Sequence, residues 1–345
     1  SSRAAKPAAA PGRAGGPAPA GLGSLLALAF PDRVAKRGEA KEDRPRPGSA
    51  RFRLPSGRTL GAEGSLAAWP WIVALDADAG MAEGRVYAGA GLTEADALAA
   101  LAPLITEELR IEWRGLGYRA RRVRAALSIV LSETALGALP REEVARAFLE
   151  RLRAEGLAIL PLEGEAGAFL ARLRWWRANS RSLGGAGLPD LTEEALAANA
   201  AEWLAPFIDP NPEAVLDARG LRRALETLLG HGLRSRFEAE APETIELPSR
   251  ARRRLEYAPD RDPAVEARIQ ELYGLSVHPR ILGRPVVFRL LSPAGRPVQV
   301  TADLPGFWRG AWTEVRKELR GRYPKHAWPE DPLHAAPATG APRRR

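Results

Sequence analysis

Residues 303–329 decide how the last third of this chain is interpreted, and they read DLPGFWRGAWTEVRKELRGRYPKHAWP. Their apolar side chains recur at helical spacing, which predicts an amphipathic terminal helix over about 304–320. Between positions 309 and 325, six cations stand against two carboxylates, a local excess of four positive charges. This mixture of cationic and aromatic side chains favours a polyanionic partner, either RNA or another single-stranded nucleic acid.

The side chains of this stretch divide into buried and exposed candidates. We expect Trp308 and Trp312 to be structural anchors, because aromatic residues at positions i and i+4 of a helix more often pack in a core than stack on bases. The exposed candidates for contact with nucleic acid are Arg316, Lys317, Arg320, Arg322, Tyr323 and Lys325. Tyr323, with His326 and Trp328, fits either stacking on bases or docking on a partner domain. Both interpretations stay open at this stage.

The length and hydrophobic content describe a globular protein of several cores. At 345 residues the chain suggests two or three domains, and 45% of its residues are hydrophobic. No apolar run approaches the ~18 residues of a membrane span, and residues 1–20 lack the pattern of an export signal. We therefore expect no membrane span and a cytoplasmic location.

Cysteine content, histidine content and charge narrow the chemistry. The chain has no cysteine and its four histidines are scattered singly, so we expect neither disulfides nor a metal site. The net charge of +9 raises the odds of a nucleic-acid partner. A composition rich in Ala, Gly and Arg also fits a GC-rich genome, so charge alone does not decide the partner.

The pattern along the chain predicts an α+β multidomain fold. An OB-like β-barrel is followed by an α-helical region and by a C-terminal α/β region with antiparallel strands and a terminal helix. The predicted boundaries are a disordered linker at 1–20, a helix end and a linker at 21–48, the OB-like domain at 49–138, the helical region at 139–240, the C-terminal α/β domain at 241–332 and a basic disordered tail at 333–345.

Short apolar runs bounded by Gly, Pro and Ser predict the strands. In the barrel they are expected at 52–54, 71–75, 85–88, 109–113 and 118–131, and one helix is expected at 94–104 after Thr93 as its N-cap. In the last region, strands are expected at 245–247, 252–257, 286–291 and 298–301, with a hairpin turn at 292–297 and a helix at 264–273.

Two further groups of arginines are candidates for contact with a phosphate backbone. Arg122 and Arg124 lie two residues apart in the long strand run, which places them on one face of the strand. Arg252 and Arg254 have the same spacing in a later strand. The alternative for the first pair is a solvated sheet face in an Arg-rich protein, and the alternative for the second is an edge strand that its charges keep soluble. Neither alternative is excluded by the sequence.

The sequence lacks the motifs of the common hydrolases, so we assign no catalytic residue. There is no G-x-x-x-x-G-K-[ST] loop to hold phosphates and no nucleophile elbow. Carboxylate pairs such as Glu107-Glu108 and Glu193-Glu194 stand at predicted helix or strand starts, where they complement a helix dipole or face solvent. We expect the chain to hold no cofactor and to be inactive as an enzyme on its own.

The C-terminal stretch closely resembles the C-terminal region of the bacterial HrpB-type ATP-dependent helicases, which belong to the DEAH-box superfamily. The resemblance rests on residues 288–332, including LLSPAGRPVQVT at 290–301. Two further stretches are similar to the same family, LLALAFPDRVAKR at 25–37 and ELYGL at 271–275. The resemblance therefore covers about 22–332.

This resemblance implies a family whose full members couple NTP hydrolysis in two RecA-like motor domains to movement on RNA, with ATP and magnesium as cofactors. It also implies winged-helix, helical-bundle, OB-like and family-specific C-terminal regions after the motor, with the end of the helical-bundle domain and a linker at 21–48. The phosphate loop and the Asp-Glu-Ala-His box are absent from this sequence. We therefore expect the C-terminal portion of such a helicase, without its motor domains.

Two functions stay open on the sequence alone. The leading hypothesis is an RNA-binding accessory region that acts with helicase motor domains in cis or in trans. The alternative is a protein-interaction module that docks on the motor or on another partner, with its positive charge serving solubility.

Overall fold

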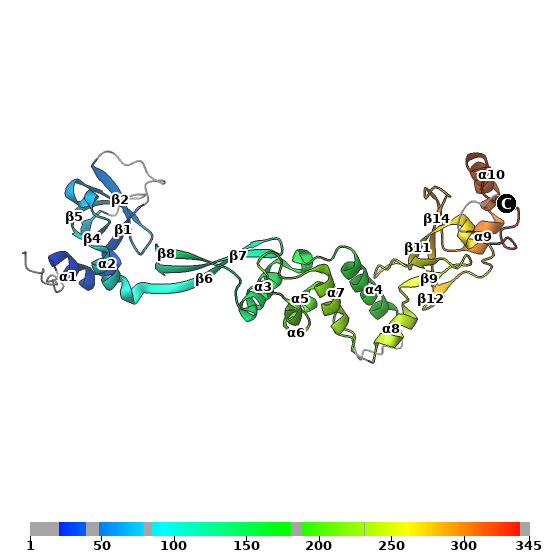
Figure 1. The fold of residues 1–345 in the computed structure, drawn as a ribbon, viewed down its shortest axis with the longest axis horizontal. Coiled ribbons are helices and arrows are strands. Elements are labelled where there is room, and N and C mark those ends of the chain that lie inside the picture. The colour runs from blue at the N-terminus through cyan, green and yellow to red at the C-terminus, as the bar shows by residue number, and fades with distance from the viewer. Residues whose placement is uncertain (1–20, 39–47, 79–83, 181–187, 231, 339–345) are drawn as a thin grey trace, which may run out of the picture. The chain divides into compact units, whose positions relative to one another are not determined.

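The computed structural model describes residues 21–38, 48–78, 84–180, 188–230 and 232–338, and it divides into two compact units (Figure 1). The first unit comprises residues up to 112 together with 119–137, and the second comprises 113–118 and the residues from 138 onward. The predicted linker at 1–20, much of the linker before the barrel and the end of the predicted tail lie outside the described residues. Within the described ranges, no helix has the length and apolar character needed to cross a bilayer.

A closed barrel of five strands forms the centre of the first unit. The order around it is β1-β2-β3-β5-β4, with β3 and β5 parallel and the other neighbours antiparallel. The strands are β1 (Val34–Arg37), β2 (Ser49–Arg53), β3 (Thr59–Glu63), β4 (Trp71–Ala77) and β5 (Gly84–Leu92). Alternate side chains such as Phe52 and Leu60 are buried inside, as the period-two geometry of a strand requires. The closed barrel confirms that a small β-barrel is present, but its strands lie at 34–92 and do not extend across the predicted 49–138.

Two helices and most of a second sheet also belong to the first unit (Figure 1). Helices α1 (Leu22–Ala29) and α2 (Glu94–Leu101) pack against each other, and the Thr93 hydroxyl caps α2 by accepting a bond from the Asp96 amide. The 3₁₀ turns are η1 (Pro31–Arg33), η2 (Gly64–Ala68) and η3 (Ala102–Leu104). The second sheet has the order β6-β7-β8, formed by β6 (Ile105–Arg114), β7 (Gly117–Ala126) and β8 (Ile129–Leu136). The helix predicted at 94–104 is confirmed as α2 and η3.

Several strand limits in this unit differ from the predictions. Strand β1 lies inside the range predicted to be a helix end and linker, because four residues are too few to show a periodic pattern. The run predicted at 118–131 is two strands, β7 and β8, which a turn at Leu127 and Ser128 separates. Leu127 adopts a positive φ of 54° in this turn. Positive φ is uncommon for a non-glycine residue, so the sequence does not predict a turn at this position. The strands β6 to β8 form a sheet of their own and do not extend the barrel.

Helices dominate the first part of the second unit, within the range where helical spacing predicts them. They are α3 (Arg141–Glu155), α4 (Glu165–Asn179), α5 (Glu193–Ala198), α6 (Ala200–Trp203), α7 (Ala218–Thr227) and α8 (Arg234–Glu240), with 3₁₀ turns η4 (Leu157–Ile159) and η6 (Ala205–Phe207). Trp175 and Trp176 of α4 are both completely buried. The Trp176 ring lies 5.2 Å from that of Phe237, so α4 and α8 share a core.

Short strands and two helices form the remainder of the second unit. The strands are β9 (Thr244–Glu246), β10 (Arg252–Arg254), β11 (Ala264–Arg268), β12 (Arg280–Ile281), β13 (Arg284–Pro285), β14 (Val287–Leu291) and β15 (Pro297–Thr301), and the helices are α9 (Leu304–Arg309) and α10 (Trp312–Arg322). Strands β9 and β10 pair, β12 and β13 pair, and a third sheet has the order β11-β14-β15. The predicted hairpin at 292–297 is confirmed between β14 and β15, where the Ser292 amide donates to the Arg296 carbonyl at 2.8 Å.

Two predicted helices of this region are corrected. Residues 264–273 do not form an α-helix: they form β11 and the 3₁₀ turn η7 (Ile269–Leu272). Strand β11 pairs with β14 in parallel, and its alternation of buried Val265 and Ala267 with exposed Glu266 is that of a strand. The predicted terminal helix divides into α9 and α10, because Gly310 takes backbone angles outside the helical region.

The last described residues run back along η7. The Gly274 amide donates to the Pro332 carbonyl, and the Ala338 amide donates to the Gln270 carbonyl, both at 2.9 Å. Residues 333–338, the described part of the predicted basic tail, thus include one backbone contact with the folded unit.

Candidate nucleic-acid interface

The two tryptophans at the end of the chain lie in an aromatic core. Trp308 and Trp312 are 5% and 1% exposed, and their ring centroids lie 5.4 Å apart. The Tyr273 ring lies 5.8 Å from Trp312, whose indole Nε1 donates to the Pro329 carbonyl at 3.1 Å. These rings anchor α9 and α10 to the unit and are not accessible for base stacking.

The cations of α10 lie close together along one helix, but most of them have a carboxylate neighbour. The pairs are Arg316 with Glu330 at 2.8 Å, Lys317 with Glu314 at 2.8 Å and Arg322 with Glu318 at 3.3 Å. Arg320 and Lys325 are exposed and make no ion pair with the described residues. The Arg316 guanidinium also lowers the pKa of Glu330 below its usual value. The local positive excess is therefore smaller in space than along the sequence.

The aromatic residues after α10 fold back on that helix. The Trp328 indole Nε1 donates to the Tyr323 carbonyl at 2.9 Å, and its ring lies 6.2 Å from Trp312. Tyr323 is half-buried, and its ring meets that of His326 edge-on at 6.4 Å. In this arrangement Tyr323 and Trp328 support the end of the chain, which leaves little of either ring for a ligand.

The middle arginine of β10 is half-buried, and the arginines on either side of it are exposed. Arg252 and Arg254 are exposed, whereas Arg253 between them forms two hydrogen bonds with the buried carboxylate of Glu271. Arg254 pairs with Glu243 at 3.2 Å. Arg252 lines an open pocket together with Glu238, Pro242, Glu243 and Thr244. Two carboxylates in this pocket oppose the binding of a phosphate there.

The arginines of β7 have a different environment. Arg122 and Arg124 are exposed and make no ion pair within the described part of the chain. Their neighbour Arg121 pairs with Glu133 of β8 at 3.2 Å. These two arginines belong to the first unit, and the candidates on β10 and α10 belong to the second.

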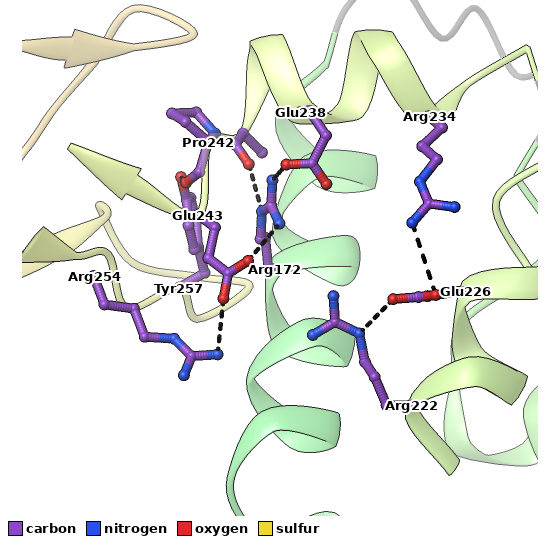
Figure 2. Close-up of polar contacts among 10 residues, drawn as sticks. Arg172, Arg222, Glu226, Arg234, Glu238, Pro242, Glu243, Arg254 and Tyr257 are labelled. Carbon is purple, nitrogen blue, oxygen red and sulfur yellow. Dashed lines mark hydrogen bonds and ion pairs between the residues drawn. The ribbon is translucent and has the colours of Figure 1, made fainter. Parts of the chain in front are cut away.

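A buried arginine that the sequence patterns did not indicate connects α4 to α8 and to the segment between α8 and β9 (Figure 2). The Arg172 side chain is 4% exposed, and its Nη2 donates to Glu238 Oε2 at 2.5 Å. Its Nε donates to the Ala241 carbonyl at 2.5 Å, and its guanidinium lies 4.2 Å from the centre of the Phe237 ring. Glu243 lies between Arg172 and Arg254, so the predicted surface residue Arg254 belongs to the same network.

The helical period contains a signal for this network. Arg172 lies three residues after Phe169 and four before Trp176, on the apolar face of α4. A cation on a buried face requires charged or hydrogen-bonding partners. Since its guanidinium is covered, Arg172 holds helices and strand together and does not contact a ligand.

A neighbouring carboxylate makes the stability of this junction depend on pH. Glu240 accepts hydrogen bonds from the Ser180 hydroxyl, the Arg236 guanidinium and the Trp176 indole, and these bonds lower its pKa to about 2. A lowered pKa contributes stability above the ordinary value near 4.5, and this contribution is lost as the pH falls towards 2. We expect Glu240→Gln to cost about 1–2 kcal/mol at neutral pH, and much less at pH ~2. Urea unfolding of both proteins at a series of pH values measures the difference.

The control for this prediction is Glu202→Gln, which alters an exposed carboxylate of α6 that makes no ion pair within the described residues. This substitution should change stability by less than about 0.5 kcal/mol at each pH. Parallel curves of unfolding midpoint against pH for the wild type and Glu240→Gln would contradict the assignment.

The comparisons with known proteins agree on one family. Residues 203–332 match the family model HrpB_C, described as ATP-dependent helicase C-terminal. The chain is 34% identical over 342 residues to the ATP-dependent RNA helicase HrpB of Escherichia coli K12, across 92% of this chain and 39% of that protein. This chain carries the C-terminal region of the HrpB-type helicases. The alignment with the crystal structure of the E. coli DExH-box NTPase HrpB covers 91% of this chain and 39% of the crystallised chain. The sequence identity is 32% and the TM-score is 0.52.

The HrpB-type match places the candidate residues in two groups. The chain spans 39% of the length of the curated relative it matches. The match to the HrpB_C family begins at residue 203 of this chain, so the matched residues include the candidates on β10 and α10. Arg122 and Arg124 lie before that region, within the longer alignment to HrpB.

Proposed function

We propose that this chain is the RNA-binding accessory portion of an HrpB-type ATP-dependent helicase, acting in the cytoplasm with motor domains in cis or in trans. The observation that carries the proposal is the similarity to an ATP-dependent RNA helicase over 92% of the chain. The net charge of +9 supports a polyanionic partner.

The barrel supports nucleic-acid binding as part of this proposal. Its five strands close in the order β1-β2-β3-β5-β4, and small five-stranded barrels of the OB type bind oligonucleotides. We propose that the barrel is of this type. Its identity as an OB fold is separate from the question of which side chains contact RNA.

ATP hydrolysis belongs, in this proposal, to the motor domains. The residues of this chain do not fit ATP and magnesium, because the sequence has no phosphate-binding loop with a following Lys-Ser or Lys-Thr. Across the described residues, no three His, Asp or Glu side chains gather where they could hold a metal ion. We propose that the chain itself uses no cofactor.

The isolated chain is expected to bind single-stranded RNA in a salt-sensitive way and to hydrolyse no ATP. If the contact neutralises about three to five phosphates, log K should fall with log[salt] with a slope of about −2 to −3.5. Filter binding with labelled RNA between about 50 and 200 mM salt measures the slope, and a coupled assay measures ATP turnover. Absence of binding even at the lowest salt would contradict the RNA-binding role, and ATP turnover would contradict the separation from the motor.

A second candidate function is a docking module for the helicase motor. It is favoured by the ion pairs of Arg316, Lys317 and Arg322, which leave few free cations on α10. Reversing the charges of Arg316, Lys317 and Arg320 to glutamate separates the candidates. Loss of RNA affinity with intact assembly supports the first function, and loss of assembly with intact RNA affinity supports the second.

A further inference from the structure

The sheet formed by β7 and β8 places two arginines opposite two hydroxyl side chains. In the antiparallel register of these strands, Arg122 faces Thr134 and Arg124 faces Ser132. All four residues are exposed. Alternate residues of a strand point to the same side of a sheet, so the four side chains form one patch, named here the β7–β8 arginine face.

No carboxylate of β7 or β8 belongs to this face. Glu133 occupies the position between Ser132 and Thr134, and it pairs with Arg121 across the opposite side of the strands. Exposed carboxylates do occur on β6, including Glu107 and Glu108. Because the sheet order is β6-β7-β8, β6 lies on the far side of β7 from β8. An anion that approaches from the β8 edge is therefore farthest from the β6 carboxylates and meets the least repulsion from them.

The other candidate clusters are less open to an anion. On α10, a phosphate would meet Glu314, Glu318 and Glu330 beside the cations that pair with them. On β10, Arg253 is held by Glu271 and Arg254 by Glu243. Among the described residues neither Arg122 nor Arg124 makes an ion pair, and a guanidinium that is not already paired can give both of its donor pairs to phosphate oxygens.

We propose that the β7–β8 arginine face binds the phosphate backbone of RNA without reading its bases. The two guanidinium groups supply bidentate charge-assisted hydrogen bonds, and Ser132 and Thr134 supply hydroxyl donors to the same phosphates. Residues i and i+2 of a strand are about 6.7 Å apart, so the two arginines can contact different phosphates of one strand. The face has no aromatic side chain on which a base could stack, so it distinguishes no sequence. This inference rests on the proposed function.

The test uses the whole chain and fluorescence anisotropy with single-stranded oligouridylate and oligoadenylate. The double variant Arg122→Ala/Arg124→Ala should reduce the slope of log K against log[salt] by about 1.4, which is about 0.7 for each phosphate of a single strand that is no longer neutralised. The matched control, Arg110→Ala/Arg121→Ala, removes the same charge from the same sheet, but both of its arginines have carboxylate partners. Its slope should change by less than about 0.5.

Two further variants separate the parts of the contact. Arg122→Lys/Arg124→Lys keeps the charges and should keep the salt slope, while affinity falls because ammonium groups cannot bind in the bidentate way. Ser132→Ala/Thr134→Val should also keep the slope and weaken binding a few-fold. Circular dichroism of each variant verifies that the sheet is folded, which is expected because all substituted side chains are exposed.

The outcomes distinguish this inference from the proposed function. Wild-type binding with equal salt slopes for the arginine double variant and its control would overturn the inference and leave the proposed function standing. A preference of more than about tenfold for one homopolymer would overturn base-independent recognition. No wild-type binding to either RNA would overturn the proposed function, and with it this inference.

Discussion

Trp312→Ala is expected to destabilise the second unit by about 3–5 kcal/mol, the usual cost of removing a large aromatic side chain from a core. The Trp312 side chain is 1% exposed and contacts the rings of Phe307, Trp308, Tyr273 and Trp328. Its loss leaves a cavity between α9, α10 and η7 and removes the donor to the Pro329 carbonyl. Urea unfolding followed by circular dichroism measures the destabilisation, and hydrogen exchange of the α10 amides should quicken.

Two variants control for this result. Trp312→Phe keeps most of the packing and should cost clearly less than alanine, since only part of the ring and one hydrogen bond are removed. Val300→Ala changes a side chain that is 63% exposed on β15 and should change stability by less than about 0.5 kcal/mol. Equal stability of Trp312→Ala and Val300→Ala would show that the aromatic core does not hold the end of the chain.

Arg253→Ala is the second large effect, with an expected cost of about 2–4 kcal/mol, because it leaves a buried carboxylate without its charged partner. The Glu271 side chain is 1% exposed, whereas Arg253 is 39% exposed, so the cost lies below that of a wholly buried pair. The Arg268 amide, which donates to Glu271 at 3.2 Å, remains among the described contacts. Urea unfolding at neutral pH measures the shift in midpoint.

The neighbouring Arg252 supplies the control for this pair. Arg252→Ala removes an exposed side chain from the same strand and should change stability by less than about 0.5 kcal/mol. The double variant Arg253→Met/Glu271→Leu replaces both charges with apolar groups and should regain much of the stability. A double variant less stable than Arg253→Ala would contradict this explanation, because the cost of Arg253→Ala would then not come from the unpaired Glu271 carboxylate.

The terminal segment shows how much of the fold local sequence can predict. The spacing of Trp308, Trp312 and Leu319 predicts a helix with a buried aromatic face, and the structure buries all three. The break at Gly310 is not predicted, because one glycine in a helical pattern does not reveal the angle that packing imposes. Periodicity therefore locates the core more reliably than it locates the ends of elements.

The wrong helix at 264–273 has a non-local cause. Residues Ile269 and Leu272 extend the apolar spacing past Val265, so the pattern fits a helix as well as a strand. The choice between helix and strand is decided by the pairing of β11 with β14, which lies more than twenty positions farther along the chain. A parallel partner at that distance leaves no local signal.

The basic candidates show a similar limit for the site. The excess of four positive charges between 309 and 325 excludes Glu330, which lies outside that window and pairs with Arg316 in the structure. Alternation along β10 predicts that Arg252 and Arg254 share a face, and both are exposed. Sequence cannot show that Glu243 or Glu271 lies within reach, because these contacts join different elements. Charge counts along a chain therefore need spatial correction before they indicate a binding surface.

The return of residues 332–338 to η7 has a consequence for the order of synthesis. The amide of Gly274 finds its acceptor in Pro332, and the carbonyl of Gln270 finds its donor in Ala338, so the second unit closes only after those residues have left the ribosome. Every strand of the first unit lies before residue 138, and domains fold as units from the N-terminus during translation. The barrel can therefore fold while the ribosome is still synthesising residues 332–338, which the second unit needs to complete its backbone hydrogen bonds.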